Sequence, residues 1–172
     1  NTFVITGNAV ILGGLTIGYS NNLTVSGNTI NLASSSAAVT SLYGFNISTY
    51  CIGAHSITNN SFTALNLTGV LTSAPTVYGI GLLVGNGATI FGNTISNIAI
   101  GAAGSAVSPS VSGILISGGT LVSVYKNKIY DISSLCTGAT GVLNGILLSG
   151  GTTNNVYNNL IGGLTATAST NS

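Results

Sequence analysis

Very few side chains in this 172-residue sequence could carry acid–base, metal or ionic chemistry. Apart from tyrosine and cysteine, the ionisable side chains are Lys126, Lys128, Asp131 and His55. Hydrolysis by paired carboxylates needs two acidic residues, a nucleic-acid surface needs clustered basic residues, and a zinc or calcium site needs several His, Cys or carboxylate ligands. We therefore predict no catalytic residue, no metal, no cofactor and no nucleic-acid partner, and we expect the two lysines and the aspartate to form a solvated group.

The single histidine is a candidate catalytic residue and the two cysteines are a candidate disulfide pair. His55 stands five residues before an asparagine that recurs along the chain, at a position held mainly by apolar residues in the other copies. We expect a buried, hydrogen-bonded histidine, because a catalytic one would need a partner acid, base or nucleophile. Cys51 and Cys136 fall at different places in repeats two apart, which disfavours a disulfide between them unless a long loop folds back.

Three aromatic residues are the most informative candidates for ligand binding. Phe91, Tyr125 and Tyr157 each stand two residues before a recurring asparagine. Flat rings on a solvent-facing surface could stack on sugar rings, as carbohydrate-binding surfaces do. The alternative is that equivalent rings in neighbouring repeats stack on one another.

A second candidate surface consists of hydroxyl groups. The positions equivalent to the three aromatics in the earlier repeats are Thr6, Ser26 and Thr58. Together with Thr24 and Ser56 they form a Thr-x-Thr-like array, which resembles the flat face of ice-binding solenoids. The array ends before the aromatic residues begin, so ice binding is the weakest of the hypotheses.

An internal repeat must position all of these residues. Each unit has a glycine within an apolar segment and, downstream, the signature Asn-x-apolar; the two are 14 residues apart in four copies. The recurring asparagines are Asn8, Asn28, Asn60, Asn93, Asn127 and Asn159. Their spacings of 20, 32, 33, 34 and 32 residues define a repeat, with loops rich in Ser, Ala, Gly and Thr inserted at one position of the longer units.

Within each unit the apolar residues alternate with period two, which predicts strands and no helix. One unit illustrates the pattern: Ile114 and Ile116 in a first strand, Val124 in a second and Ile129 in a third. Three short strands with one apolar face each predict a triangular coil, and parallel stacking of the coils satisfies the backbone. We align Phe3, Ile5 and Thr6 with the second strand, which predicts about six coils and, at ~4.8 Å per coil, a rod about 29 Å long.

The asparagines and corner glycines have a physical reason to recur. Asn tolerates left-handed dihedral angles and its amide can bond the backbone at a tight corner. Stacked at one register, the amides can also bond one another, so we predict an asparagine ladder along the coil. The glycines at 85/87, 118/119 and 150/151 predict a second corner with positive φ.

A family resemblance rests on the Ser-Gly-Gly-Thr corners at 117–120 and 149–152, each followed by Val-Tyr-x-Asn. This pattern resembles the right-handed parallel β-helix repeats of large secreted Bacteroidota proteins over essentially the whole chain. The resemblance implies type IX secretion and a place at the cell surface, although no C-terminal sorting domain is visible. The pectate-lyase-like enzymes of the wider β-helix class need acidic calcium ligands and a basic residue that this sequence cannot supply.

The ends of the sequence do not resemble caps. Either flanking repeats of a longer chain cover them, which we favour, or copies of the chain stack head to tail. We expect one all-β domain over 1–172, a right-handed parallel β-helix with no membrane insertion, since no window approaches 18 uninterrupted apolar residues. The predicted function is that of a noncatalytic extracellular stalk, adhesin or filament repeat, with carbohydrate binding as the alternative and surface glycans as further candidate partners.

Overall fold

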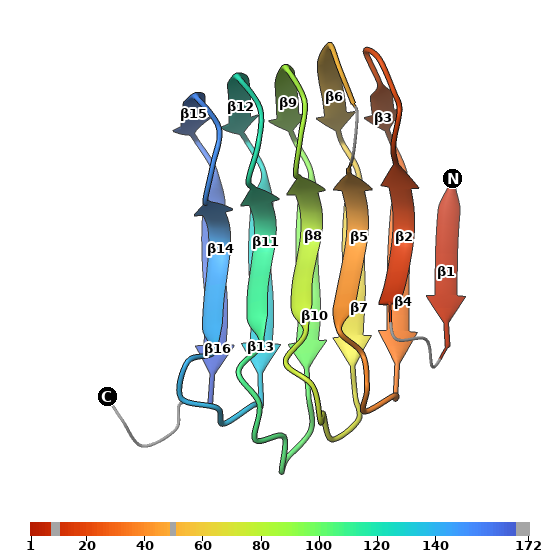
Figure 1. Ribbon diagram of the computed structural model, residues 1–172, viewed down its shortest axis with the longest axis vertical. Coiled ribbons are helices and arrows are strands. Elements are labelled where there is room, and N and C mark those ends of the chain that lie inside the picture. Colours follow the sequence, from red (N-terminus) through yellow and green to blue (C-terminus); the bar gives the residue numbers. More distant parts are fainter. Residues whose placement is uncertain (8–10, 49–50, 168–172) are drawn as a thin grey trace.

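The structure is a computed structural model that describes residues 1–7, 11–48 and 51–167. The regular structure of these residues is entirely β, with sixteen strands arranged in three parallel sheets (Figure 1). The prediction of an all-β parallel solenoid is therefore confirmed.

Each coil contributes one strand to each sheet, in the order sheet 1, sheet 2, sheet 3. Sheet 1 contains β2 (Ile11–Ile17), β5 (Ser41–Ile47), β8 (Thr76–Leu82), β11 (Ser110–Ile116) and β14 (Val142–Leu148). Sheet 2 contains β3 (Thr24–Ser26), β6 (Ala54–Thr58), β9 (Gly87–Phe91), β12 (Leu121–Tyr125) and β15 (Thr153–Tyr157). Sheet 3 contains β1 (Thr2–Thr6), β4 (Thr29–Ser34), β7 (Ser61–Leu67), β10 (Thr94–Ile100), β13 (Lys128–Ser134) and β16 (Leu160–Ala166).

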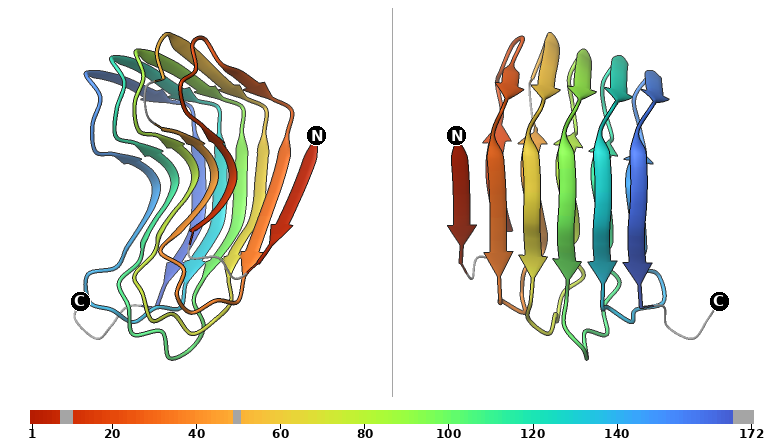
Figure 2. Two further views of the ribbon diagram at one scale, coloured as in Figure 1. Left: turned by 45° about the vertical axis from the view of Figure 1, so that its right-hand side comes forward. Right: turned by 180° about the vertical axis from the view of Figure 1, so that it is seen from behind.

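The coil is right-handed. In Figure 1 the strands of sheet 1 run upward at the front and those of sheet 3 run downward behind them, while the chain advances from right to left. The left-hand view of Figure 2 shows that the strands of sheet 1 are curved, so the coil is not a regular triangle. The described residues form five complete coils and one additional strand, β1, in rough agreement with the predicted six coils.

Equivalent residues of successive coils lie side by side, as the repeat predicts. In sheet 2, for example, Val25 pairs with Ile57, Ile57 with Ile90, and Ile90 with Val124. Corresponding columns in the other sheets give a continuous apolar interior, in which Ile57, Ile90 and Val124 have no exposed surface. Burial of these aliphatic side chains is the main favourable contribution to the fold.

The placement of the first strand was wrong. β1 belongs to sheet 3, where Phe3 pairs with Ile30 and Ile5 with Leu32, so neither residue lies in a sheet 2 column. Strands of all three sheets alternate with the same period, and the alternation alone cannot distinguish them. Asn8, which set the alignment, lies outside the described residues.

The glycine of the repeat signature allows sheets 1 and 3 to approach closely. A Cβ atom built on Gly113 would lie 2.5 Å from Cγ2 of Ile129 in sheet 3 and 2.6 Å from the carbonyl oxygen of Gly145 in the next coil. Gly79 is in the same situation against Ile95. This position therefore excludes a side chain because of packing, whereas the corner glycines Gly85, Gly119 and Gly151 have the predicted positive φ.

Candidate functional site

The predicted asparagine ladder runs through the corner between sheets 2 and 3. The side-chain Nδ2 of Asn60 donates to Oδ1 of Asn93 at 3.1 Å, and the Nδ2 of Asn93 donates to Oδ1 of Asn127 at 3.0 Å. The pattern begins at Asn28 and continues to Asn159. Each receiving Oδ1 also accepts the backbone N–H of the preceding asparagine, so one amide oxygen closes two bonds between coils.

From Asn60 onward, each ladder amide also bonds to the preceding coil. The Nδ2 of Asn93 donates to the carbonyl oxygen of Ile57 at 2.8 Å, and that of Asn127 donates to the carbonyl oxygen of Ile90 at 2.9 Å. Asn93 and Asn127 have no exposed surface. Their buried amides are therefore fully engaged in holding three successive coils together.

Two details of the ladder differ from expectation. Asn1 extends the ladder at its beginning, with its Nδ2 3.4 Å from Oδ1 of Asn28, whereas the predicted ladder member Asn8 lies outside the described residues. The left-handed conformation belongs to the residue before each ladder asparagine, as at Asn59 and Lys126, both with φ of 54°. The asparagines are thus selected for their amide bonds, and the preceding residues make the turn.

The three candidate aromatic residues lie in one column on the outer face of sheet 2. The ring centroids of Phe91 and Tyr125 are 4.9 Å apart, as are those of Tyr125 and Tyr157; the second pair is parallel to within 6°. Lys126 places its Nζ 5.9 Å from the centroid of the Phe91 ring. The three rings form the predicted column, in which Tyr125 and Tyr157 are stacked and the planes of Phe91 and Tyr125 are tilted by 34°.

The hydroxyl array is present only in part. Thr24 pairs with Ser56 and Ser26 with Thr58 on the outer face of sheet 2. Thr6, however, pairs with Ala33 in sheet 3, so it does not extend this array. The hydroxyl array required by the ice-binding hypothesis therefore extends over only two coils, through Thr24 and Ser26 in one and Ser56 and Thr58 in the next.

His55 is buried and hydrogen-bonded, as predicted. Its Nδ1 accepts the backbone N–H of Leu23 at 3.3 Å, and its Nε2 has no hydrogen-bond partner. An Nδ1 that accepts a hydrogen bond places the proton of the neutral ring on Nε2. Burial lowers the pKa of His55 below its ordinary value because the charged form is poorly solvated.

The two cysteines are buried and are not joined in a disulfide. Cys51 donates to the carbonyl oxygen of Ile17 and Cys136 to that of Ile100, at sulfur–oxygen distances of 3.5 and 3.8 Å. Both thiols thus lie against backbone of the preceding coil.

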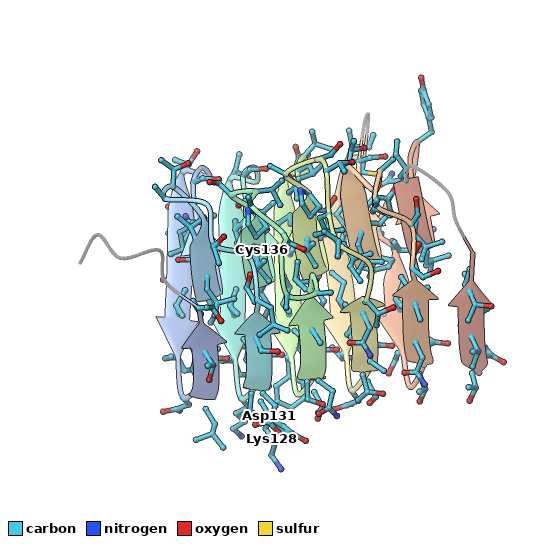
Figure 3. The ribbon with its side chains drawn as sticks, turned by 90° about the horizontal axis from the view of Figure 1, so that it is seen from below. Lys128, Asp131 and Cys136 are labelled. Atoms are coloured by element: carbon cyan, nitrogen blue, oxygen red, sulfur yellow. The ribbon has the colours of Figure 1, made fainter. Side chains whose placement is uncertain are left out.

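The ionic side chains lie together on one side of the molecule. Figure 3 shows Lys128 and Asp131 close to the same edge of the structure, well away from Cys136. Both residues belong to β13 and, like Lys126, are exposed, as expected of a solvated group. In the part of the chain that the structure describes, no three His, Cys, Asp or Glu residues come together as a metal would require.

Sequence reasoning missed a shallow groove on the outer face of sheet 3. Asn97, Asp131 and Gly163 occupy equivalent places in successive coils and all have left-handed φ, between 54° and 61°. The chain bends there, and the groove is lined by these three residues together with Asn66, Ser133 and Thr165. The sequence carried a partial signal: Asn, Asp or Gly, the residues that best tolerate left-handed φ, stands four positions after Asn93, Asn127 and Asn159. The same position after Asn60 is Ala64, which has a left-handed φ of 61° without that signal.

A second aromatic pair was also missed. Tyr43 and Tyr78 stack on the outer face of sheet 1 with ring centroids 5.4 Å apart and planes 13° apart. Burial, and then the neighbouring Tyr43, raise the pKa of Tyr78 to about 12. Each tyrosine directly precedes a repeat glycine, which is the feature that could have identified the pair.

Among the described residues there is no helix of the length and apolarity needed to span a bilayer. No protein-family model, curated protein or solved structure matches the chain.

Proposed function

We propose that this protein is a noncatalytic structural β-solenoid, serving outside the cell as a stalk, adhesin or filament repeat of a surface protein. The observation that carries the proposal is the use of the recurring polar side chains. The side-chain amides of Asn93 and Asn127, like those of the other inner ladder residues, form hydrogen bonds to the coils before and after them. A chain whose repeated side chains serve coil-to-coil contact is suited to stiffness along one axis.

The extracellular part of the proposal rests on the resemblance to secreted Bacteroidota repeats and their type IX export. The composition is compatible with it, because a structure held by backbone ladders, amides and aliphatic columns depends little on ionic strength. The proposed partners are flanking repeats of a longer chain or other copies of this chain, with surface glycans as a further candidate.

Carbohydrate binding through Phe91, Tyr125 and Tyr157 is the second candidate function. Tyr157 supports it, because this tyrosine is 47% exposed and no further ring of the column covers it among the described residues. The parallel stacking of Tyr125 on Tyr157 weighs against it, since the ring faces that a sugar would cover are turned toward each other.

Two measurements on the purified 172-residue chain test these proposals. Electron microscopy should show rigid rods of uniform width, as single particles or joined end to end, and a compact or irregular particle would contradict the structural proposal. A glycan array should show no retention. Retention that is lost in Tyr157→Ala but kept in Tyr157→Phe would establish carbohydrate binding instead.

A further inference from the structure

We propose that Asn86 is a self-modifying site, at which the backbone nitrogen of Gly87 attacks the side-chain amide and converts it, without an enzyme, to an aspartyl or isoaspartyl group. Water is the co-reactant and ammonia is released. The two residues lie where the chain enters β9, at the top of the third of the five complete coils in Figure 1. The inference is independent of the proposed structural function.

The reaction needs no other reagent. The Gly87 nitrogen forms a bond to Cγ of Asn86, the bond between Cγ and Nδ2 breaks, and the amide nitrogen leaves as ammonia with the proton of the Gly87 N–H. Water then opens the cyclic imide. Opening at Cγ gives an aspartyl side chain, whereas opening at the backbone carbonyl leaves the chain linked through Cγ, as isoaspartate. Attack within one chain is favoured because the reacting groups are already close.

The sequence offers this reaction at two places. An asparagine directly precedes a glycine only at Asn86 and at Asn144. A glycine leaves the attacking nitrogen unhindered and lets the backbone turn toward the side chain. The described ladder asparagines precede Thr, Ser, Lys or Leu, and their amides are held by hydrogen bonds, as at Asn93 and Asn127.

The structure leaves Asn86 free to react. Its side chain is exposed, lies outside the strands and forms no hydrogen bond among the described residues. The preceding residue, Gly85, has a φ of 135°, which side-chain-bearing residues rarely adopt. A Cβ atom built on Gly87 would have only the carbonyl oxygen of Leu121 within 4 Å, so there is room around the attacking nitrogen.

The same dipeptide is locked at Asn144. This asparagine lies within β14 and pairs in register with Ser112 of β11. Gly145 is buried, and a Cβ atom built on it would lie 2.5 Å from Cγ2 of Ile161 in sheet 3. Closing the imide there would turn the chain in the middle of a packed strand, so we expect the amide of Asn144 to persist.

One hydrogen bond opposes the reaction at Asn86. The Gly87 N–H donates to the carbonyl oxygen of Gly53 at 3.2 Å and has to leave it before the attack. Gly87 is the first residue of β9, beside an exposed corner, where local opening costs less free energy than in the middle of a strand.

The isoaspartyl product changes the contact between coils. The backbone carbonyl of Asn86 accepts the N–H groups of Thr120 at 2.9 Å and Leu121 at 3.1 Å. Isoaspartate moves that group out of the main chain, which should break both bonds, whereas aspartate keeps them. Either product gives the sequence a second acidic side chain and lowers its formal net charge from +1 to zero.

The test follows the full 172-residue chain in mildly alkaline buffer, with peptide mapping by mass spectrometry over time. In the folded protein Asn86 should convert at least about tenfold faster than Asn144, which corresponds to about 1.4 kcal/mol in activation free energy. In urea the two sites should convert at similar rates, since the dipeptide is the same. Hydrogen exchange should show lost protection at Thr120 and Leu121 in the isoaspartyl fraction only.

The matched variant is Asn86→Gln, which keeps an exposed amide but should form no acidic product at this position. Equal rates at Asn86 and Asn144 in the folded protein would overturn the proposal, as would an Asn86 that converts only in urea. Unequal rates in urea would show that local sequence, and not the corner, selects the site. These outcomes leave the structural function standing, because the shape of the particle tests that separately.

Discussion

The side-chain Nδ2 of Asn93 donates to Oδ1 of Asn127 at 3.0 Å, and neither residue has any exposed surface. The two residues are 34 positions apart in the sequence and adjacent in space. Their contact is one step of a ladder that also bonds the backbone of both neighbouring coils. A central ladder position should therefore be among the least replaceable in the protein.

Replacing Asn93 with Ala should lower the free energy of unfolding by roughly 3 kcal/mol. The substitution leaves the carbonyl oxygen of Ile57 and the amide groups of Asn60 buried without their partners. Urea unfolding followed by circular dichroism gives the value. Asn155→Ala, at an exposed position of β15, is the control and should change stability by less than about 0.5 kcal/mol. Equal losses for the two variants would contradict the structural role of the ladder.

Stability should fall as the pH drops below the ordinary histidine pKa of 6.5. Burial lowers the pKa of His55, so the unfolded chain binds a proton before the folded chain does. The contribution of neutral His55 is fully present above pH 6.5 and is lost progressively as the pH falls toward the folded-state pKa. Unfolding midpoints measured in urea between pH 5 and 8 show the effect. His55→Gln should remove this dependence, because the sequence has no other histidine; an unchanged profile in that variant would refute the assignment.

Gly113→Ala should destabilise the protein by about 1–3 kcal/mol. The added methyl group would lie 2.5 Å from Cγ2 of Ile129 and 2.6 Å from the carbonyl oxygen of Gly145, so sheets 1 and 3 would have to move apart. Gly162→Ala is the matched control, since a Cβ atom there has nothing within 4 Å. Thermal unfolding compares the two variants, and a similar melting temperature for both would show that the close approach of the sheets is unimportant.

Tyr125→Ala should cost about 0.5–1.5 kcal/mol beyond the loss of buried area, because it removes the middle ring of a three-ring stack. Tyr125→Phe keeps the ring and should be close to wild type in stability. Chemical unfolding of both variants measures the contribution of the stack. If neither substitution changes stability, the column does not serve coil-to-coil packing, and the carbohydrate-binding hypothesis gains weight.

Much of this architecture could be predicted from the spacing of single residue types. In a parallel solenoid with coils in register, one position of the repeat becomes one column in space. The contacts between Asn93 and Asn127 and between Tyr125 and Tyr157 follow from that rule, although each pair is more than thirty residues apart. Period-two alternation likewise predicted that Val124 and Ile129 are buried, but it does not hold across the bend at Asp131, where buried Ile129 and Ile132 are three positions apart.

The column to which Phe3 belongs could not be predicted in the same way. Strands of all three sheets alternate apolar and polar residues, and the sheet that a terminal strand joins depends on backbone pairing with β4. The bend at Asn97 and Asp131 and the stacking of Tyr43 on Tyr78 were also missed, although the recurrence of these residues in the repeat marked both places. The repeat specifies which residues are equivalent, because equivalence is a property of spacing. Only the tertiary structure decides how columns of different sheets pack against one another across the interior. Those contacts depend on backbone bends and on packing between segments that share no sequence pattern.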